Sequence, residues 1–302
     1  MIAFASNSLL CRAALKESSI DPASFTFIRL FSGALALWLI MTIRNGMMVE
    51  RTASPLIKSS ESTLAVPRHL SLRDGNWISA VALFVYAAGF SVAYASLSAG
   101  TGALLLFGAV QATMVLWGLH RGERLSIIQI AGVIITLVGF VVLVFPGLSA
   151  PPLAGSILML GAGIAWGVYS VRGKGERNPT GATAGNFVRA VPFAAALSII
   201  FAPWMHAHLD GVIYAVISGA VTSGLGYIIW YGALPGLRAA SAATVQLSVP
   251  VLTATGGILL LSEPMTLRYL IASIAVLGGI ALVIATPHPQ SQTASPASRS
   301  RS

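Results

Sequence analysis

Long apolar runs separated by short polar connections make up most of the sequence, and they limit the folds that the chain can adopt. Only 9% of its 302 residues are charged, whereas a soluble domain carries about 25%. A soluble chain with so little charge could not cover its own surface, but a lipid bilayer rewards apolar surface and penalises charge. The chain is therefore predicted to be an all-α membrane protein.

Apolar stretches near the length that a helix needs to cross a bilayer occur ten times. Their expected bounds are 2–16, 26–43, 77–97, 101–119, 125–145, 153–171, 184–204, 211–233, 240–261 and 265–286. The first stretch is short, so the sequence leaves open whether the N-terminus is complete. The segment 44–75 is expected to be a cytoplasmic loop, with a short interfacial helix as the alternative. The Pro/Ser-rich tail 287–302 is expected to be disordered and cytoplasmic.

Lysine and arginine are distributed unevenly between the two sides of the membrane that this helix count defines. Thirteen of the 18 fall on the side of the termini, two fall on the other side, and three lie inside or at the edge of a span. Positive charge gathers on the cytoplasmic side, so both termini are predicted to be cytoplasmic. The net charge of +9 is scattered between apolar runs, which indicates a lipid bilayer as partner and no nucleic acid.

The chain contains an internal repeat. Gly122-Glu123 and the following IIQIAGVIITLVGFVVLV match Ser262-Glu263 and the following LRYLIASIAVLGGIALVI at an offset of 140 residues. These matches predict a first five-helix repeat at 1–146, which includes the loop 44–75, and a second at 152–286.

An offset of 160 residues relates other positions, placing Arg29 on Arg189 and Arg12 on Arg172. Two tandem repeats with an odd number of spans must lie upside down relative to each other. Inverted repeats are typical of secondary transporters, whose substrate site lies between the halves.

Several segments carry a resemblance to a known family. They are SNSLLCRAAL, DPASFTFIRLFSGALAL, YASLSAGTGALL and GERLSIIQIAGVIITLVGFVVL in the first half, and AWGVYSV, GNFVRAVPFAAAL, GYIIWYGAL and QLSVPVLTATGGILLLSEPMTLRYLIASIAVLGGIALVI in the second. Over nearly all of residues 1–286 the chain resembles the EamA-type domains of the drug/metabolite transporter superfamily. The resemblance implies ten transmembrane helices in two inverted EamA-like repeats, a central cavity, a bacterial inner membrane, and export or exchange of small metabolites. It does not select a cargo.

The acidic residues and histidines favour some mechanisms over others. None of the nine acidic residues lies at mid-membrane in the expected spans, and the five histidines lie in loops, at helix ends or in the tail. Proton relays use buried Asp, Glu or His, so efflux, exchange or facilitated diffusion by alternating access is expected. The alternatives are a proton-coupled exporter of the same fold, a channel, or a non-transporting scaffold. No metal site, cofactor or enzymatic activity is expected, and a homodimer is left open.

Two arginines, Arg29 and Arg189, fall inside the expected spans. One interpretation is that each lies near a helix end and extends to the lipid headgroups. The other is that they bind an anionic group of the substrate through the planar guanidinium. Arg12 is expected to extend to the headgroups.

The other candidate substrate-binding residues are polar, aromatic or helix-bending side chains within the spans. They are Asn7, Gln111, Trp166, Tyr169, Asn186, Gln246 and Pro250. Buried amides in lipid need partners, so Gln111 and Gln246 are expected to face the interior, either to bind substrate or to join helices. Pro250 is expected to free a backbone carbonyl and bend its helix.

Glu123 and Glu263 precede the last helix of each repeat. They are interpreted as partners of the helix dipole or as gating ion pairs with Arg124 and Arg268. Gly163 and Gly167 form a GxxxG pair, which predicts close helix packing.

Overall fold

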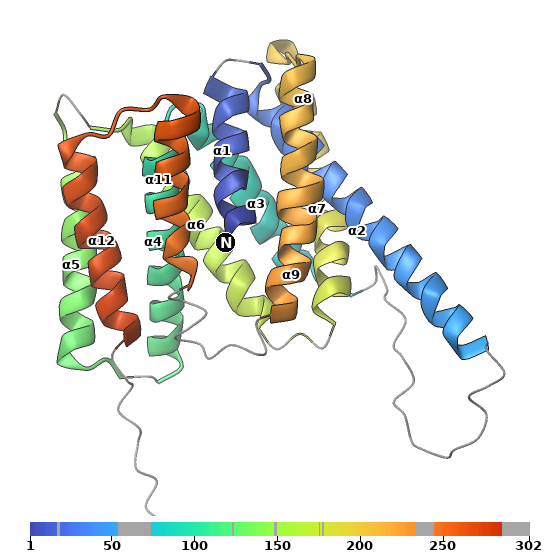
Figure 1. The fold of residues 1–302 in the computed structure, drawn as a ribbon, viewed down its shortest axis with the longest axis horizontal. Coiled ribbons are helices and arrows are strands. Elements are labelled where there is room, and N and C mark those ends of the chain that lie inside the picture. Colours follow the sequence, from blue (N-terminus) through green and yellow to red (C-terminus); the bar gives the residue numbers. More distant parts are fainter. Residues whose placement is uncertain are drawn as a thin grey trace, which may run out of the picture.

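The computed structural model of the chain is a bundle of long helices that lie side by side (Figure 1). It describes residues 1–16, 19–53, 74–122, 124–147, 150–174, 176, 178–233 and 245–285, with the backbone alone for 45–53. The elements are α1 (Ile2–Lys16), α2 (Pro22–Ala53), α3 (Trp77–Tyr94), α4 (Ala99–His120), α5 (Ile127–Val144), α6 (Leu153–Gly173), α7 (Pro179–Ile200), η2 (Ala202–Trp204), α8 (Leu209–Val216), η3 (Ile217–Leu225), α9 (Gly226–Ala233), α11 (Ser248–Leu261) and α12 (Leu267–Ala285).

Within these described ranges, eight helices are long and apolar enough to cross a membrane, with α8, η3 and α9 together forming one of them. The helices α1 and α11 are shorter, at 15 and 14 residues. The predicted class, a multi-pass all-α membrane protein, is therefore confirmed.

Two expected boundaries differ most from the structure. Residues 44–53, expected in a loop, continue α2 to Ala53, because Met, Arg, Glu and Ala favour helix strongly enough to carry it past Gly46. The ninth expected span, 240–261, forms α11 only from Ser248. Residues 54–73, 240–244 and the tail 287–302 lie outside the described ranges, and so does Glu123.

Polar side chains at the N-termini of the helices fix where α3, α4 and α5 begin. Asn76 accepts a hydrogen bond from the Ser79 amide, Ser98 caps α4, and Ser126 forms a capping box with Gln129. Each cap satisfies amides that have no partner within the helix. These short polar positions explain how the chain reverses direction between apolar helices.

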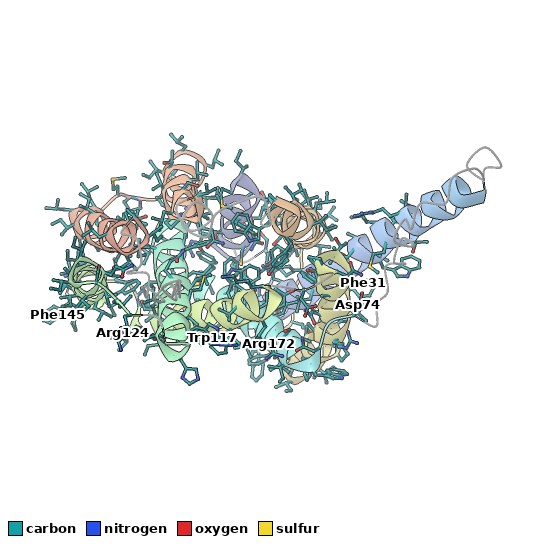
Figure 2. All side chains as sticks on the ribbon, turned by 90° about the horizontal axis from the view of Figure 1, so that it is seen from below. Phe31, Asp74, Trp117, Arg124, Phe145 and Arg172 are labelled. Carbon is teal, nitrogen blue, oxygen red and sulfur yellow. The ribbon has the colours of Figure 1, made fainter. Side chains whose placement is uncertain are left out.

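Large apolar side chains cover the outer surface of the bundle. Phe31, Trp117 and Phe145 are 50%, 44% and 64% exposed, and Figure 2 shows Phe145 at the outer edge of the molecule. Lipid chains are the solvent that suits such a surface.

The helices α5 and α12 pack closely in opposite directions. A Cβ added to Gly132 would lie 2.6 Å from the carbonyl oxygen of Gly279, and one added to Gly139 would lie 2.8 Å from a methyl group of Val276. Glycine at these places allows the two backbones to approach.

The other long helices also have defined directions. The α2 N-terminus meets the α7 C-terminus, where Ser198 donates to the Ala23 carbonyl, so these two helices are antiparallel. The helices α4 and α11 are antiparallel as well, because Gly100 lies against Ala254 while Gln111, at the middle of α4, reaches Gln246, which precedes α11.

The helix α3 lies between α1 and α6. The α1 residues Asn7 and Arg12 contact Tyr86 and Tyr94 in that order, so α1 is parallel to α3. In contrast, the start of α6 lies at the C-terminal end of α3 and its end lies at the N-terminal end of α3, where Arg172 donates to Ser79.

The segment α8–η3–α9 runs antiparallel to α1. Gly211 lies against Ile20, Ser218 bonds Asn7, and Gly226 faces Ala3. Since α1 is parallel to α3, this segment also runs opposite to α3.

The GxxxG prediction is confirmed at the contact of α6 with α4. A Cβ on Gly163 would lie 2.5 Å from the Leu106 carbonyl oxygen, and one on Gly167 would lie 2.7 Å from the Thr113 Cβ. The two glycines therefore bring α6 against α4.

Candidate functional site

Polar side chains from several helices meet at the middle of α3. The Tyr86 hydroxyl accepts hydrogen bonds from the Asn7 amide at 3.3 Å and from Nη2 of Arg29 at 2.9 Å. The side-chain oxygen of Asn7, Oδ1, in turn accepts hydrogen bonds from the hydroxyl of Ser218 at 2.6 Å and from that of Thr222 at 3.3 Å. With Ser223, which also contacts Arg29, these residues form what we call the central polar cluster: Asn7, Arg29, Tyr86, Ser218, Thr222 and Ser223.

Arg29 is enclosed by protein, with 1% of its surface exposed. Its Nε donates to Ser223 at 3.3 Å, and its guanidinium lies 5.2 Å and 4.9 Å from the ring centres of Tyr86 and Phe90. In the described part of the chain its Nη1 has no hydrogen-bond partner. The interpretation that Arg29 extends to the headgroups is therefore wrong, because the side chain points inward, toward α3 and η3.

The segment η3 is a nine-residue π-helix inside a membrane span. It places Ser218, Thr222 and Ser223 on the buried face. A Cβ added to Gly219 would collide with the carbonyl oxygen of Arg29, so glycine permits the close approach of α2. π-Helical turns are rare and often lie at functional sites.

Aromatic rings border the cluster. The Trp166 ring centre lies 4.8 Å from that of Tyr86, 4.9 Å from Tyr227 and 6.3 Å from Phe4. Tyr169 stacks on Trp166 at 5.3 Å. Of the two predicted aromatic residues, Trp166 thus lies against the central polar cluster and Tyr169 lies one step beyond it.

Asn186 and Arg189 lie in a different place. Asn186 accepts from the backbone amide of Asn76 at 2.9 Å, and Arg189 donates to the carbonyl of Asp74 at 2.9 Å. The Arg189 guanidinium faces the Trp77 ring at 6.0 Å. These contacts anchor α7 to the chain before α3, so the structure separates Arg189 from Arg29 by about 15 Å along α3.

Gln111 and Gln246 are both buried and face each other, with Nε2 of the first 3.4 Å from Oε1 of the second. Gln111 also lines a mainly apolar cavity of about 270 Å³ between α4, α5 and α12. The helical pattern is interrupted at Leu247, one residue after Gln246. Pro250 lacks the N–H that would bond the Gln246 carbonyl, which explains the interruption. This group joins α4 to α11 and does not contact the central polar cluster through any described hydrogen bond.

Glu263 is buried at the turn between α11 and α12. One carboxylate oxygen accepts from Nε of Arg12 at 2.9 Å, and the other accepts from the Ala99 amide at 2.8 Å, at the start of α4. Arg12 also donates to the Tyr94 carbonyl at 2.9 Å. The expectation that Arg12 extends to the headgroups is wrong, because a carboxylate from the far end of the sequence lies beside it.

Glu263 lies at a helix N-terminus and in an ion pair with an arginine, as expected, but the helix is α4 instead of α12 and the arginine is Arg12 instead of Arg268. Arg268 instead donates to the Phe145 carbonyl. The turn depends on Ser262, whose φ of +50° lies in the left-handed region. Such a φ is uncommon for a residue other than glycine.

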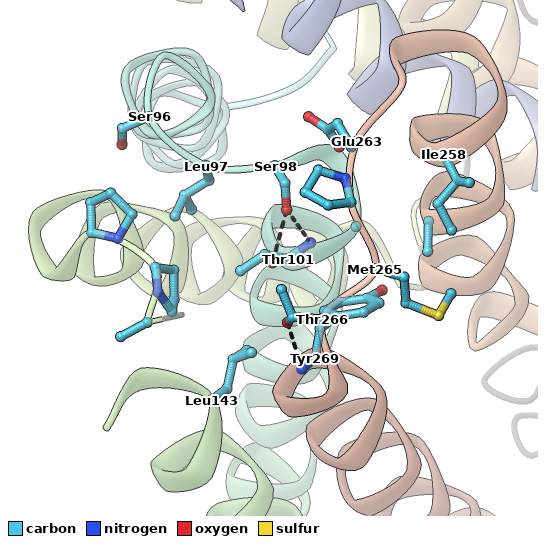
Figure 3. Close-up of a pocket in the computed structure, with 16 residues that line it drawn as sticks. Ser96, Leu97, Ser98, Thr101, Leu143, Ile258, Glu263, Met265, Thr266 and Tyr269 are labelled. Carbon is cyan, nitrogen blue, oxygen red and sulfur yellow. Dashed lines mark hydrogen bonds between the residues drawn. The ribbon is translucent and has the colours of Figure 1, made fainter. Parts of the chain in front are cut away.

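A cavity of about 200 Å³ adjoins Glu263 (Figure 3). Ser98, Thr101 and Tyr269 contribute to its lining, and the Ser98 hydroxyl bonds Thr101. A smaller cavity at the opposite end of α3 is lined by Tyr169 and Arg172 among others. The central polar cluster thus lies between two cavities at opposite ends of the bundle.

Asp21 is the acidic residue at the start of α2. Its carboxylate accepts hydrogen bonds from the amides of Ala23 and Ser24 at 3.0 Å and 2.9 Å, and from the amide of His206 at 3.1 Å. Burial disfavours the charged carboxylate, but hydrogen bonds at Ser24, His206 and Ala23 outweigh this cost and lower the Asp21 pKa below its ordinary value.

Sequence reasoning missed Tyr86 and the η3 hydroxyls of the cluster. Tyr86 lies in an apolar span that also contains Tyr94, and Ser218, Thr222 and Ser223 are short side chains that are common in membrane helices. The one available signal was the spacing of Ser218 and Thr222, which places both hydroxyls on one helix face.

The comparisons with known proteins agree with this architecture. Residues 153–285 match the model of the EamA-like transporter family. Uncharacterized protein PA1977 of Pseudomonas aeruginosa is 52% identical over 285 residues, which cover 94% of this chain and 92% of that protein.

An uncharacterized transporter of Archaeoglobus fulgidus is 26% identical over 301 residues, with 95% of this chain and 96% of the relative covered. A solved crystal structure with 19% identity has a TM-score of 0.61 over 93% of this chain and 96% of that chain, so the two share a fold. The chain belongs to the EamA-like transporter family and is a multi-pass membrane transporter.

Proposed function

We propose that the chain is a secondary transporter of small metabolites that works by alternating access between two inverted five-helix halves, 1–146 and 152–286. The observation that carries this proposal is the direction of the helices that the sequence repeat relates. The pairs are α1 with α6, α2 with α7, α3 with α8–η3–α9, α4 with α11, and α5 with α12. Each pair runs antiparallel, as an inverted repeat of ten transmembrane helices requires.

The packing of the helices supports the same proposal. Exchanging each helix for its repeat counterpart turns the α3–α6 contact into that of α1 with α8 and η3. It turns the α4–α6 contact into α1–α11, and α3–α7 into α2–η3. All of these contacts are present, while α2–α7, α4–α11 and α5–α12 are exchanged with themselves.

The turns before the last helix of each half add a local correspondence. Gly122 and Ser262, which the 140-residue offset relates, have positive φ values of +90° and +50°. Serine rarely adopts this conformation, so its presence at the repeat position of a glycine supports a common origin of the two turns.

The central polar cluster is built from both proposed halves, where a transporter of this kind holds its substrate. Asn7, Arg29 and Tyr86 come from the first half, and the η3 hydroxyls come from the second. The contact of Arg12 with Glu263 closes one end of the helix bundle to the substrate. At the other end Arg172 donates to Asn76 and Ser79.

The proposed location is a bacterial inner membrane, with both termini and the Arg172 end in the cytoplasm. Lysine and arginine are concentrated on that side. Of the carboxylates whose side chains are described, those of Asp21, Asp74, Glu176 and Glu263 lie outside the long spans, and that of Asp210 is exposed in the first turn of the span Leu209–Ala233. Exchange or facilitated diffusion is therefore proposed ahead of proton-coupled export.

The test is transport in proteoliposomes with a labelled panel of amino acids, nucleosides, purines and organic anions, each with and without a pH gradient and with internal cargo. We expect saturable flux that persists without the gradient and increases with internal cargo. Glu263→Gln is expected to change this flux, because it weakens the contact that closes one end. Asp210→Asn, at an exposed residue in the first turn of α8, is the control.

Three outcomes would contradict the proposal. Flux that requires the gradient would make the protein a proton-coupled exporter. Flux that does not saturate would make it a channel. An absence of flux from folded protein would favour a scaffold.

A further inference from the structure

Arg29 carries a charge that none of the described carboxylates neutralises. Within the described part of the chain the ion pair is that of Arg12 with Glu263. The Asp21 carboxylate caps α2, and Asp74 accepts from the Asn178 amide at 2.6 Å. Among the described residues, Arg29 donates to hydroxyls and lies against aromatic rings, and its Nη1 has no hydrogen-bond partner.

Burying the Arg29 guanidinium without a carboxylate partner among the described residues costs free energy, and a functional role explains why the residue is there. Burying a cation without a counterion is strongly unfavourable, and an arginine inside a membrane span usually has a functional role. Neutral hydroxyls orient the guanidinium but do not cancel its charge. The arrangement is therefore suited to a ligand that brings the missing negative charge.

The surroundings of Arg29 define the rest of the ligand. Nη1 makes no hydrogen bond to the described residues, and a planar guanidinium can present two parallel N–H groups to a carboxylate or phosphate. Asn7 and Ser218 lie in the same hydrogen-bonded cluster, while Trp166 and Tyr227 form an aromatic wall beside Tyr86. The site thus combines one cationic end with an apolar side.

We infer that Arg29 binds the anionic group of the cargo and that the cargo is a small organic anion whose apolar part lies against Trp166. Binding at Arg29 stands on the structure alone. Only the claim that the bound anion is carried across the membrane rests on the proposed function.

The first experiment measures binding by the purified full chain in a neutral detergent. Thermal unfolding is followed during titration with potassium acetate or potassium phosphate, against matched concentrations of potassium chloride, with acetamide as the uncharged analogue of acetate. At least one of the two anions is expected to raise the melting temperature above the chloride control, and acetamide is not. The anion that acts distinguishes a carboxylate cargo from a phosphate cargo.

Variants assign the effect to one side chain. Arg29→Gln is expected to weaken anion binding about tenfold to a hundredfold, the effect of one charge-assisted hydrogen bond or two. Arg29→Lys keeps the charge without the planar fork, so it should bind between the wild type and Arg29→Gln and serves if Arg29→Gln fails to fold. Arg189→Gln, at the position related by the repeat, should bind as the wild type does. The inference is overturned if neither anion stabilises the wild type, or if Arg29→Gln and Arg29→Lys respond as the wild type does.

Flux in proteoliposomes separates this inference from the proposed function. If the stabilising anion binds but is not transported, the site stands and the transporter proposal fails for that cargo. If a neutral solute shows saturable flux while neither anion binds, the transporter proposal stands and the anion site is overturned.

Discussion

The sequence repeat relates Arg12 to Arg172 and Arg29 to Arg189. The two arginines of the first half nevertheless have different surroundings from the two of the second half. Arg12 and Arg29 contact residues far along the chain, from α11–α12 and η3. Arg172 and Arg189 contact the residues that begin α3. A repeated residue type at a repeated helix position thus does not fix a role, because the neighbouring helices determine whether the charge is buried, paired or left at the edge.

The helix α3 explains the difference, because all four arginines contact it or the residues at its ends. In the first half, Arg12 contacts Tyr94 and Arg29 contacts Tyr86. In the second half, Arg172 contacts Ser79 and Arg189 contacts Asp74. The repeat counterpart of α3 is the segment α8–η3–α9, which is interrupted by the π-helix η3 and is not a continuous α-helix. The π-helix presents hydroxyl groups to its neighbours. The two halves therefore present different surfaces to equivalent arginines.

The largest effect is expected from breaking the Arg12 contact. Arg12→Ala leaves the buried Glu263 carboxylate with the Ala99 amide, so we expect a loss of about 3 kcal/mol of unfolding free energy. Arg172→Ala removes hydrogen bonds to neutral partners only and should cost less than about 1 kcal/mol. Reversible unfolding by SDS in mixed micelles measures both. Equal losses would remove the distinction between the two arginines, whereas a double variant of Arg12→Ala with Glu263→Gln should cost less than the sum of the single variants.

The second prediction concerns how Arg29 comes to be buried. Gly219→Ala places a methyl group against the Arg29 carbonyl and the Ser32 hydroxyl, and overpacking of this kind costs about 2 kcal/mol. Gly161 has no described residue within 4 Å of its added Cβ, so Gly161→Ala should be neutral or stabilise by less than about 1 kcal/mol. The same unfolding measurement tests both, and an equally tolerated Gly219→Ala would show that close approach of η3 is not needed.

The third prediction compares the partners of Arg29 and Arg189. Tyr86→Phe removes the oxygen that accepts from Asn7 and Arg29 while keeping the ring, and should cost about 1–2 kcal/mol. Trp77→Phe retains an aromatic ring beside Arg189 at the exposed side of α3, and should cost less than about 1 kcal/mol. Thermal unfolding in detergent gives the order of the two effects. The reverse order would indicate that the Arg189 end contributes more to stability.

The smallest effect is expected in the pH dependence of the two helix starts. Asp21 caps α2, whereas the neutral Asn178 caps α7. Because the folded-state pKa of Asp21 is lowered, its contribution to stability is present above the unfolded pKa of about 4 and is lost as the pH falls below it. Melting temperatures between about pH 6 and pH 3 should fall less in Asp21→Asn than in the wild type. Asn178→Asp should not reduce the fall, and parallel curves for Asp21→Asn and the wild type would contradict this assignment.

The sequence predicted the helices well where apolar composition decides the structure. The bounds of α1 were expected correctly, and Gly163 and Gly167 were correctly expected to pack closely, because apolar length and small residues act locally. The continuation of α2 to Ala53 was missed, because the loss of apolar character at Arg44 marks the end of a span and not the end of a helix.

The candidate site was less predictable because its contacts join distant parts of the chain. Arg12 lies 251 residues from Glu263, and no local pattern shows that they meet. A position near a helix end suggested contact with headgroups for Arg12, Arg29 and Arg189 alike. Only the packing of α3 and η3 separates these cases, and the π-helix that positions Ser223 has no distinct sequence pattern.

The order of synthesis gives the position of Arg29 a consequence for biogenesis. Its partners Tyr86 and Ser223 follow it by 57 and 194 residues. At translation rates of about 5–20 residues per second, roughly 10–40 s separate the synthesis of Arg29 from that of Ser223. During this interval the newly made helix α2 carries the Arg29 charge, which lipid disfavours. We therefore expect insertion of the first half to depend on the translocon or on Tyr86 to shelter Arg29, and a chain truncated before η3 to be degraded by membrane quality-control proteases.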